Sequence, residues 1–347
     1  MTKPLSYKDS GVDIDEKNKT FSKISEFVSK KSSRVLNTMG AFASVIDINF
    51  PEYKEPLLVF KLEEPGTKQK LALQYGSLNS VAFDMINHLV NDIIVMGAKP
   101  LAVQDLIVCG KLKDEIITPL IKAMSEACKI NECELVGGET SEQPGVVDEE
   151  IHILGASIIG VLDKCNLIDG QKIKSGDVLL AIPSNGLHTN GYSLARRLIK
   201  DYPEIVEEKI EGERFIDIVL KPHLTYLPAL KEILTPNYFN GLAHITGGGI
   251  EGNLSRIIPD GICAEVDLGL VNVLPIFKFI KEKGKVEDSD MLRTFNLGVG
   301  LIAVVDKENI QKIQRILLEK DLKSYEIGEI KTSSNEQKVR FKNKLNF

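Results

Sequence analysis

The sequence predicts an α/β (α+β) fold built from two domains of similar size in tandem. Apolar strand-like runs alternate with amphipathic helical runs along the chain, and its 347 residues exceed what one small core uses. A polar, glycine-punctuated segment at residues 169–177 interrupts this alternation halfway along. We therefore predict a first domain over residues 1–170 and a second over residues 171–347.

In the first half, strands and helices are expected to alternate. The expected strands are 57–62, 101–109, 133–136 and 151–162, and the expected helices are 79–96 and 115–130. The long helix 79–96 places Val81, Met85, Leu89 and Ile93 along one face, which is the spacing of an amphipathic helix.

The second half repeats this style. The expected strands are 178–183, 242–245, 262–266 and 297–305, and the expected helices are 192–200, 224–234, 273–282 and 310–318. Two similar α/β units in tandem suggest a duplication, although the residues themselves show no repeat.

The composition is that of an ordinary globular protein. With 43 basic and 49 acidic residues the net charge is −6, so we expect neither nucleic acid nor an anionic membrane as a partner. No segment approaches the roughly 18 apolar residues of a membrane span, and we expect no secretory signal. The 5 cysteines contain no C-x-x-C pair, which favours small buried hydrophobes in a reducing compartment, most simply the cytoplasm.

Glycine clusters follow several of the expected strands, where bare backbone N–H groups can approach phosphate oxygens. The first cluster is Gly66-Thr67-Lys68, after strand 57–62, and it adds a hydroxyl and a point charge. Such a turn is also common as a purely structural feature, so this motif alone leaves both interpretations open.

Asp92 lies in an apolar stretch of helix 79–96, where an unpaired carboxylate would be costly. We therefore expect a cation beside it. A magnesium ion and an ordinary salt bridge or solvent-facing position are equally good explanations at this point.

Two more carboxylates follow expected strands. Glu63 precedes the Gly66 turn, and Glu139 follows Gly138 on an expected glycine turn after strand 133–136. Together with Asp92, these groups could surround a hard cation and its bound phosphates. The pattern indicates a magnesium–nucleotide site without a Walker or G-x-G-x-x-G motif.

Two polar loops in the second half are candidates for substrate binding. His188, Thr189 and Asn190 lie between strand 178–183 and the next helix, where Thr189 or Asn190 could equally be a helix N-cap. Gly247, Gly248 and Gly249 follow strand 242–245 as a second anion cradle. Three consecutive glycines lose much backbone entropy on ordering, so a purely structural role is less favoured there than anion binding.

Several of these motifs occur in one order along the chain. They are the segments 6–15, 91–92 with 96–100, 135–140, 186–194, 244–249 and 293–300. Together they resemble the phosphoribosylformylglycinamidine cyclo-ligase (aminoimidazole ribonucleotide synthetase) family, from about residue 6 to residue 331. Its superfamily also includes thiamine monophosphate kinase, selenophosphate synthetase and a hydrogenase-maturation protein.

The resemblance implies a fold and a reaction. The N-terminal domains of two chains would pair into a β-barrel across a homodimer, with ATP near that interface. ATP and Mg²⁺ would serve to phosphorylate the formyl oxygen of formylglycinamidine ribonucleotide, after which the amidine nitrogen attacks and the imidazole ring closes.

The resemblance also assigns roles to the candidate residues. Lys68 and His188 would be catalytic, and Glu63, Asp92 and Glu139 would bind the metal. The remaining assignments are cofactor binding by Glu63, Gly66, Thr67, Lys68, Asp92, Gly138 and Glu139, and substrate binding by His188, Thr189, Asn190, Gly247, Gly248 and Gly249.

The chain departs from the family at three places on the nucleotide side. Glu63-Glu64-Pro65 replaces Asp-Gly-Val, Ser25 replaces a lysine with Lys23 nearby, and a glycine-rich run reads Gly40-Ala41-Phe42-Ala43. We expect Glu63 to remain a working ligand, because the fixed φ of Pro65 can hold a retracted turn, and Glu64 to be a bystander.

Two other functions stay open at this point. A small-molecule kinase of the same superfamily would share the acidic sites but close no ring. The second is a non-catalytic nucleotide-binding paralogue, which the altered turn at Glu63 would fit.

Overall fold

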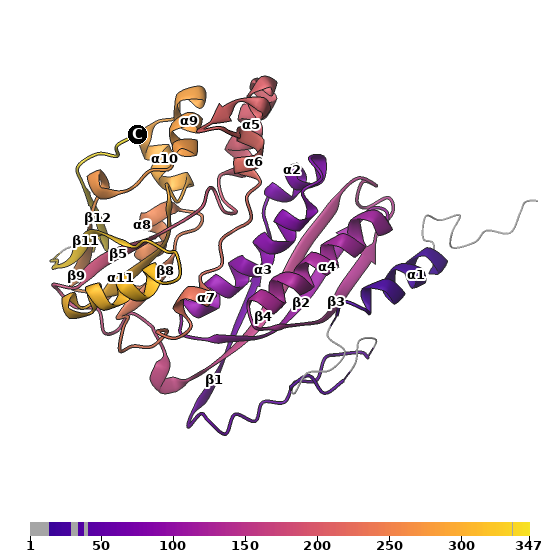
Figure 1. Cartoon of the computed structure of the whole chain (residues 1–347), viewed down its shortest axis with the longest axis horizontal. Helices are drawn as coiled ribbons and strands as arrows, with labels where there is room; N and C mark the ends of the chain where they lie inside the picture. The colour runs from indigo at the N-terminus through magenta and orange to yellow at the C-terminus, as the bar shows by residue number, and fades with distance from the viewer. Residues whose placement is uncertain (1–13, 29–33, 38–40, 335) are drawn as a thin grey trace, which may run out of the picture.

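The computed structural model describes residues 14–28, 34–37, 41–334 and 336–347 (Figure 1). Most of the segment 6–15, which carries part of the resemblance, lies outside the described residues. Gly40, the first residue of the altered glycine-rich run, lies outside them as well. Among the described residues, no helix has the length and apolar character needed to cross a membrane.

The first half forms a mixed sheet with strand order β1-β4-β2-β3. Its elements are α1 (Ile14–Ile24), β1 (Pro56–Glu63), α2 (Lys68–Gln74), α3 (Leu78–Ile94), β2 (Lys99–Cys109), α4 (Asp114–Ile130), β3 (Glu134–Glu142) and β4 (His152–Asp163). Figure 1 shows α3 and α4 packed side by side on one face of this sheet. The strands and helices expected from periodicity in this half are confirmed, apart from the length of β3.

The opposite face of the first sheet carries apolar side chains in contact with solvent. Along β1, Leu58, Phe60 and Leu62 are 44%, 67% and 72% exposed, while the alternate residues face the helices. Leu106 of β2 and Ile153 of β4 are exposed as well. Contiguous apolar faces of this kind are typical of interaction sites, because they are unfavourable in water.

The glycine turn expected at Gly137 and Gly138 is wrong, because both residues lie inside β3. The register against β2 shifts between Val103 and Gln104, so this stretch is a β-bulge, and Gly137 has φ +134°. A Cβ on Gly138 would lie 2.1 Å from the carbonyl oxygen of Asp105 on β2. Only glycine lets these two strands approach so closely.

The second half forms a mixed sheet with strand order β12-β9-β11-β5-β10-β8. Its elements are β5 (Val178–Pro183), α5 (Tyr192–Asp201), β6 (Lys209–Ile210), β7 (Glu213–Arg214), α6 (Phe215–Val219), α7 (Leu227–Leu230), β8 (Gly241–His244), α8 (Gly249–Leu254), β9 (Ile262–Asp267), α9 (Pro275–Gly284), α10 (Asp288–Thr294), β10 (Val299–Val305), α11 (Ile310–Leu318), β11 (Tyr325–Thr332) and β12 (Val339–Lys342). Sequence periodicity missed α1, α2, α6, α10, β6, β7, β11 and β12. All five cysteines were expected to be buried, whereas Cys165 is exposed.

The expected helix 224–234 shrinks to α7, because residues 220–226 form an irregular strap along α3 that is neither helix nor strand. Polar side chains of α3 at spacings of four, three and four residues bind the backbone of this strap. The contacts are Ser80 Oγ to the Leu220 carbonyl, His223 N–H to Asp84 Oδ1 (2.7 Å), Asn87 Nδ2 to the His223 carbonyl (2.7 Å), Asn91 Nδ2 to the Leu224 carbonyl (2.8 Å) and Tyr226 N–H to Asn91 Oδ1 (3.1 Å). One buried helix face thus joins the two halves of the chain.

Asp105 gives a first testable prediction, because burial raises the pKa of its carboxyl to about 7 and the charge of Glu139 adds to the shift. Between pH 4 and 7 the folded chain therefore holds a proton that the unfolded chain has lost, so stability falls as pH rises. We expect Asp105→Asn to exceed the wild type by about 2–4 kcal/mol in unfolding free energy at pH 8 and to match it near pH 4.

Urea denaturation across this pH range measures the effect. The exposed Asp148 supplies the control, and Asp148→Asn should change little at any pH. Parallel pH profiles for Asp105→Asn and the wild type would show that Asp105 is ionised in the fold.

Candidate active site

A cavity of about 530 Å³ opens where the two halves meet. Its walls come from β1, α3 and β8 and from the loops around residues 190 and 247. The polar residues that line it are Lys61, Glu63, His88, Asp92, Asp169, Asn190, His244, Thr246, Asn253 and Arg256. The cavity is therefore built from segments that are distant in sequence, as expected for a binding site between two domains.

Two of the predicted metal ligands, Glu63 and Asp92, come together in this cavity. The Nζ atom of Lys61 lies 2.9 Å from Glu63 Oε2 and 2.9 Å from Asp92 Oδ2, so it bridges the two carboxylates. Burial lowers the pKa of Lys61, but the two negative charges outweigh it and the net pKa is raised. The cation expected beside Asp92 is thus a lysine in this structure.

Asp92 has a second partner on the other side of the cavity. His244 of β8 lies with Nδ1 2.7 Å from Asp92 Oδ1. Burial alone would raise the pKa of Asp92, but the hydrogen bond from His244 and the positive charges nearby hold it well below its usual range. Asp92 is therefore ionised and links the first half of the chain to the second.

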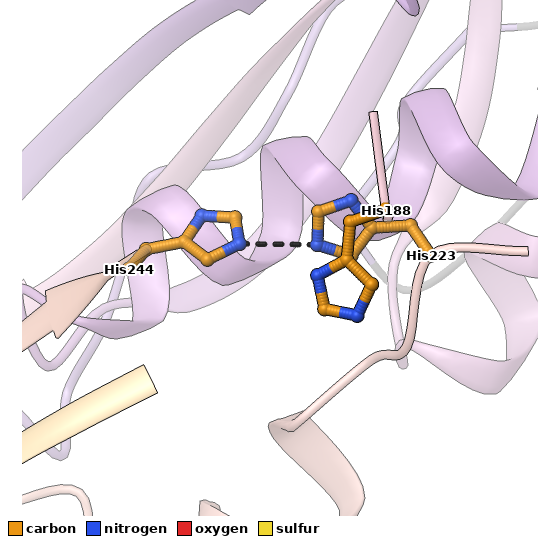
Figure 2. A group of neighbouring side chains, drawn as sticks. All are labelled: His188, His223 and His244. Atoms are coloured by element: carbon orange, nitrogen blue, oxygen red, sulfur yellow. Dashed lines mark hydrogen bonds between the residues drawn. The ribbon is translucent and has the colours of Figure 1, made fainter. Parts of the chain in front are cut away.

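Four of the 5 histidines gather beside Asp92. Figure 2 shows three of them, with His223 Nε2 3.0 Å from His244 Nε2 and the ring of His188 stacked 3.9 Å from that of His223. Burial lowers the pKa of His88 to about 4 and holds the pKa values of His188 and His223 well below their usual range. These three imidazoles are neutral at pH 7.

Sequence reasoning singled out only His188 from this cluster for chemistry of its own. His88 could have been found, because it precedes Asp92 by four residues and shares its helix face. His223 carried no signal, since it lies in the strap one residue before the expected helix 224–234. Lys61 and Asp84 were missed because alternation along a strand or helix does not reveal which polar groups pair.

The structure places Lys68 away from the cavity. Its ammonium is fully buried, lies 2.9 Å and 2.8 Å from the two carboxylate oxygens of Asp84, and donates to the carbonyl oxygens of His188 (3.3 Å) and Lys221 (2.5 Å). Burial raises the pKa of Asp84 to about 6, although the charge of Lys68 opposes this shift. Lys68 thus ties α2 to α3 and to two loops of the second half, and its catalytic role stays a prediction.

Gly66, Thr67 and Lys23 also have positions that the fold itself explains. Gly66 has φ +63°, which favours glycine at the turn between β1 and α2. Thr67 is the N-cap residue of α2, and its side chain forms no capping hydrogen bond. Lys23, named beside Ser25 on the nucleotide side, instead pairs with Asp114 of α4 at 2.5 Å.

Glu139 and Gly138 are not brought to the cavity within one chain. They lie on β3, which β4 and β2 separate from β1. Three strand spacings place β3 about 14 Å from β1, so Glu139 does not share an ion with Glu63 in the same chain. Glu139 pairs in register with Leu106 and is exposed.

Each of the two predicted substrate loops contributes one of its predicted residues to the cavity. Asn190 and Gly247 line the cavity, and Asn190 Oδ1 would lie 2.9 Å from a Cβ on Gly247. The hydroxyl of Thr189 lies 3.1 Å from Nδ1 of His88. Gly249 is required by packing, because it has φ +63° and a Cβ there would lie 1.9 Å from the Leu292 carbonyl oxygen.

This fold and its intersheet cavity define a class of protein. The AIR synthase related N-terminal domain matches residues 43–162, and the corresponding C-terminal domain matches residues 174–339. The chain therefore belongs to the AIR synthase related family, as its motifs suggested, and has the mixed α/β two-domain fold of that family.

Particular relatives narrow the comparison. A phosphoribosylformylglycinamidine cyclo-ligase of Streptococcus pneumoniae (strain P1031) is 36% identical over 341 residues, covering 98% of this chain and 99% of the relative. A thiamine-monophosphate kinase from Stenotrophomonas maltophilia K279a superposes with a TM-score of 0.67 at 13% identity, covering 95% of this chain and 96% of that one. The hydrogenase maturation protein HypE in complex with ATP superposes with a TM-score of 0.60 at 17% identity, covering 87% and 84%.

Lys68→Met tests the structural position of Lys68. The variant leaves Asp84 buried without its cation, so we expect a loss of about 3–5 kcal/mol in unfolding free energy. The double variant Lys68→Met/Asp84→Asn should recover part of this loss, because a neutral amide still accepts the N–H of His223.

Urea denaturation measures both variants. Lys174→Met removes an exposed lysine paired with Asp306 and should change little. Wild-type stability in Lys68→Met would show that the Lys68–Asp84 pair does not hold the two halves together.

Proposed function

We propose that this chain uses ATP and Mg²⁺ to close the imidazole ring of formylglycinamidine ribonucleotide, forming aminoimidazole ribonucleotide in the cytoplasm. The observation that carries the proposal is the pair of carboxylates, Glu63 and Asp92, held side by side in a large cavity. The identity to the cyclo-ligase over 98% of the chain supports the specific reaction.

The donor set fits Mg²⁺, which prefers carboxylate oxygens to imidazole nitrogens. Lys61 already holds a positive charge between Glu63 and Asp92, so these two carboxylates are arranged around a cation. Magnesium bound there would neutralise phosphate charge as the phosphoryl group of ATP moves. Lys61 would turn toward the phosphates when the ion binds.

The chemistry asks for positioning more than for a protein nucleophile. The formyl oxygen attacks the terminal phosphorus of ATP, and ADP leaves. The amidine nitrogen then attacks the activated carbon, a proton is lost from that nitrogen, and phosphate leaves as the ring closes. Asn190 and Gly247 also line the cavity, and we propose that they orient the substrate.

His188 and Lys68 take indirect parts in this proposal. Both side chains are buried away from the cavity, so we assign them the positioning of the loop that carries Asn190. Gly66, Thr67, Gly138, Glu139, Gly248 and Gly249 keep the binding roles that the resemblance implies as proposals. Glu139 lies on the exposed sheet face and would act at a chain–chain interface.

One assay separates the competing functions. The chain is incubated with ATP, Mg²⁺ and formylglycinamidine ribonucleotide, and both ADP and aminoimidazole ribonucleotide are measured. Both products support the cyclo-ligase. ADP with a phosphorylated but open-chain product indicates a small-molecule kinase, which the fold shared with thiamine-monophosphate kinase favours, and no turnover indicates a non-catalytic paralogue.

Glu63→Gln and Glu64→Gln form a matched pair of variants. Glu63 faces Lys61 and the cavity, whereas Glu64 is exposed and contributes only its N–H to Glu63 Oε1 (3.3 Å). We expect Glu63→Gln to lower turnover by about 100-fold, because several kcal/mol of charge stabilisation depend on the metal. Glu64→Gln should stay close to wild type in the same assay. Equal activity of the two variants would show that Glu63 is not a metal ligand.

We also propose that two chains pair through the uncovered face of the first sheet, forming the barrel that the resemblance implies. The apolar side chains on this face supply the driving force, since pairing removes them from water. Phe60→Lys places a charge on this apolar face and should yield a monomer in multi-angle light scattering. Leu318→Lys, at an exposed leucine of α11, should remain dimeric.

The mass of the wild-type chain in solution tests the dimer directly. A single species of 38.4 kDa for the wild type at micromolar concentration would contradict the dimer.

A further inference from the structure

We propose that His188, His223 and His244 bind a late first-row divalent ion, typified by Zn²⁺, at the junction of the two halves. The three side chains come from the loop before α5, the strap and β8, and Figure 2 shows them gathered at one point. One ligand atom from each histidine lies within 4.8 Å of the others. The proposal concerns metal binding and holds whichever reaction the chain catalyses.

The first argument is the hydrogen bonding of the buried rings. His188 and His223 are each 1% exposed. Among the described residues, neither ring nitrogen of His188 has a hydrogen-bond partner. Nδ1 of His223 has none among them either. A buried polar group without a partner is unfavourable. A metal ion would satisfy one ring nitrogen of His188, the residue whose two ring nitrogens both lack a partner in the described part of the chain.

The second argument is the orientation of His244. Its Nδ1 lies 2.7 Å from Asp92 Oδ1, which leaves Nε2 directed at His223. Histidines that ligate zinc usually donate the other ring N–H to a carboxylate, which fixes the tautomer and the ring orientation. Asp92 is therefore placed to orient a ligand.

The third argument is the spacing. His223 Nε2 and His244 Nε2 are 3.0 Å apart, and two ligands of a tetrahedral zinc ion at about 2.0–2.1 Å are about 3.3 Å apart. His188 stacks on His223 with ring centroids 3.9 Å apart, so its ring must rotate out of the stack to reach the ion. Its backbone is fixed, because its carbonyl accepts from Lys68 and from Tyr192.

The backbone of His188 is consistent with a functional position. It has φ +60°, a left-handed conformation that costs free energy in a residue with a side chain and is concentrated at functional sites. Three imidazoles favour Zn²⁺, Co²⁺ or Ni²⁺ over Mg²⁺, which prefers oxygen ligands. The site thus differs in chemistry from the carboxylate pair beside it.

Metal titration of the full-length chain tests the proposal without nucleotide or substrate. The chain is treated with a chelator, dialysed and titrated with Zn²⁺ in a calorimeter, and Co²⁺ is added separately to record its visible spectrum. We expect one Zn²⁺ per chain and a tetrahedral Co²⁺ spectrum. His223→Gln should weaken Zn²⁺ binding at least about 100-fold, because it removes a direct ligand.

The fifth histidine provides the matched control. His152 of β4 is also buried but lies outside the cluster, so His152→Gln should bind Zn²⁺ as the wild type does. Zn²⁺ should also raise the thermal midpoint of the wild type and of His152→Gln but not that of His223→Gln. If His223→Gln does not fold, His188→Gln replaces it in the same measurements.

Three results would overturn the proposal. They are the absence of saturable Zn²⁺ binding by the wild type, equal binding by a folded histidine-cluster variant, and displacement of Zn²⁺ by an equal concentration of Mg²⁺. The last result would assign the ion to Glu63 and Asp92.

Discussion

The buried face of α3 is the constraint on which the rest of the structure depends. The strap at residues 220–226 forms neither helix nor strand, so its N–H and C=O groups need other partners. Polar side chains of α3 supply them. Lys68 of α2 contacts this face through Asp84 and also binds two carbonyl oxygens of the second half. A buried charge is tolerated only with such partners, so the loop at His188 and the strap must lie where the ammonium can reach them.

This attachment sets the geometry of the cavity. Because the strap and the His188 loop are fixed on α3, β8 of the second half comes close enough for His244 to contact Asp92. Asp92 then belongs to two groups at once, the carboxylates around Lys61 and the imidazoles beyond His244. A change of charge on one side of Asp92 is therefore felt on the other, which couples the proposed magnesium site to the proposed zinc site.

The sequence allowed the main strands and helices to be predicted, because one-sided burial imposes a period that survives in the residues, as in β1 and α3. It did not reveal Asn87 or His223, nor that Asn91 binds the strap, since a polar residue that binds a distant backbone looks the same in sequence as one that faces water. Of the three carboxylates that the sequence suggested around one cation, Glu63 and Asp92 lie on either side of Lys61. Glu139 lies apart from them, because the strand order β1-β4-β2-β3 separates β1 from β3, and local patterns do not encode strand order.

The altered turn after β1 shows how one substitution can be absorbed locally. The Glu63 side chain is one methylene longer than the aspartate usual in the family, yet its Oε2 still lies 2.9 Å from Lys61. Its Oε1 accepts the N–H of Glu64, so the carboxylate folds back over the end of its own strand. Pro65 is buried and Glu64 is exposed, which leaves the turn anchored by its proline. The extra length is thus accommodated by the side chain, and the carboxylate remains beside Asp92.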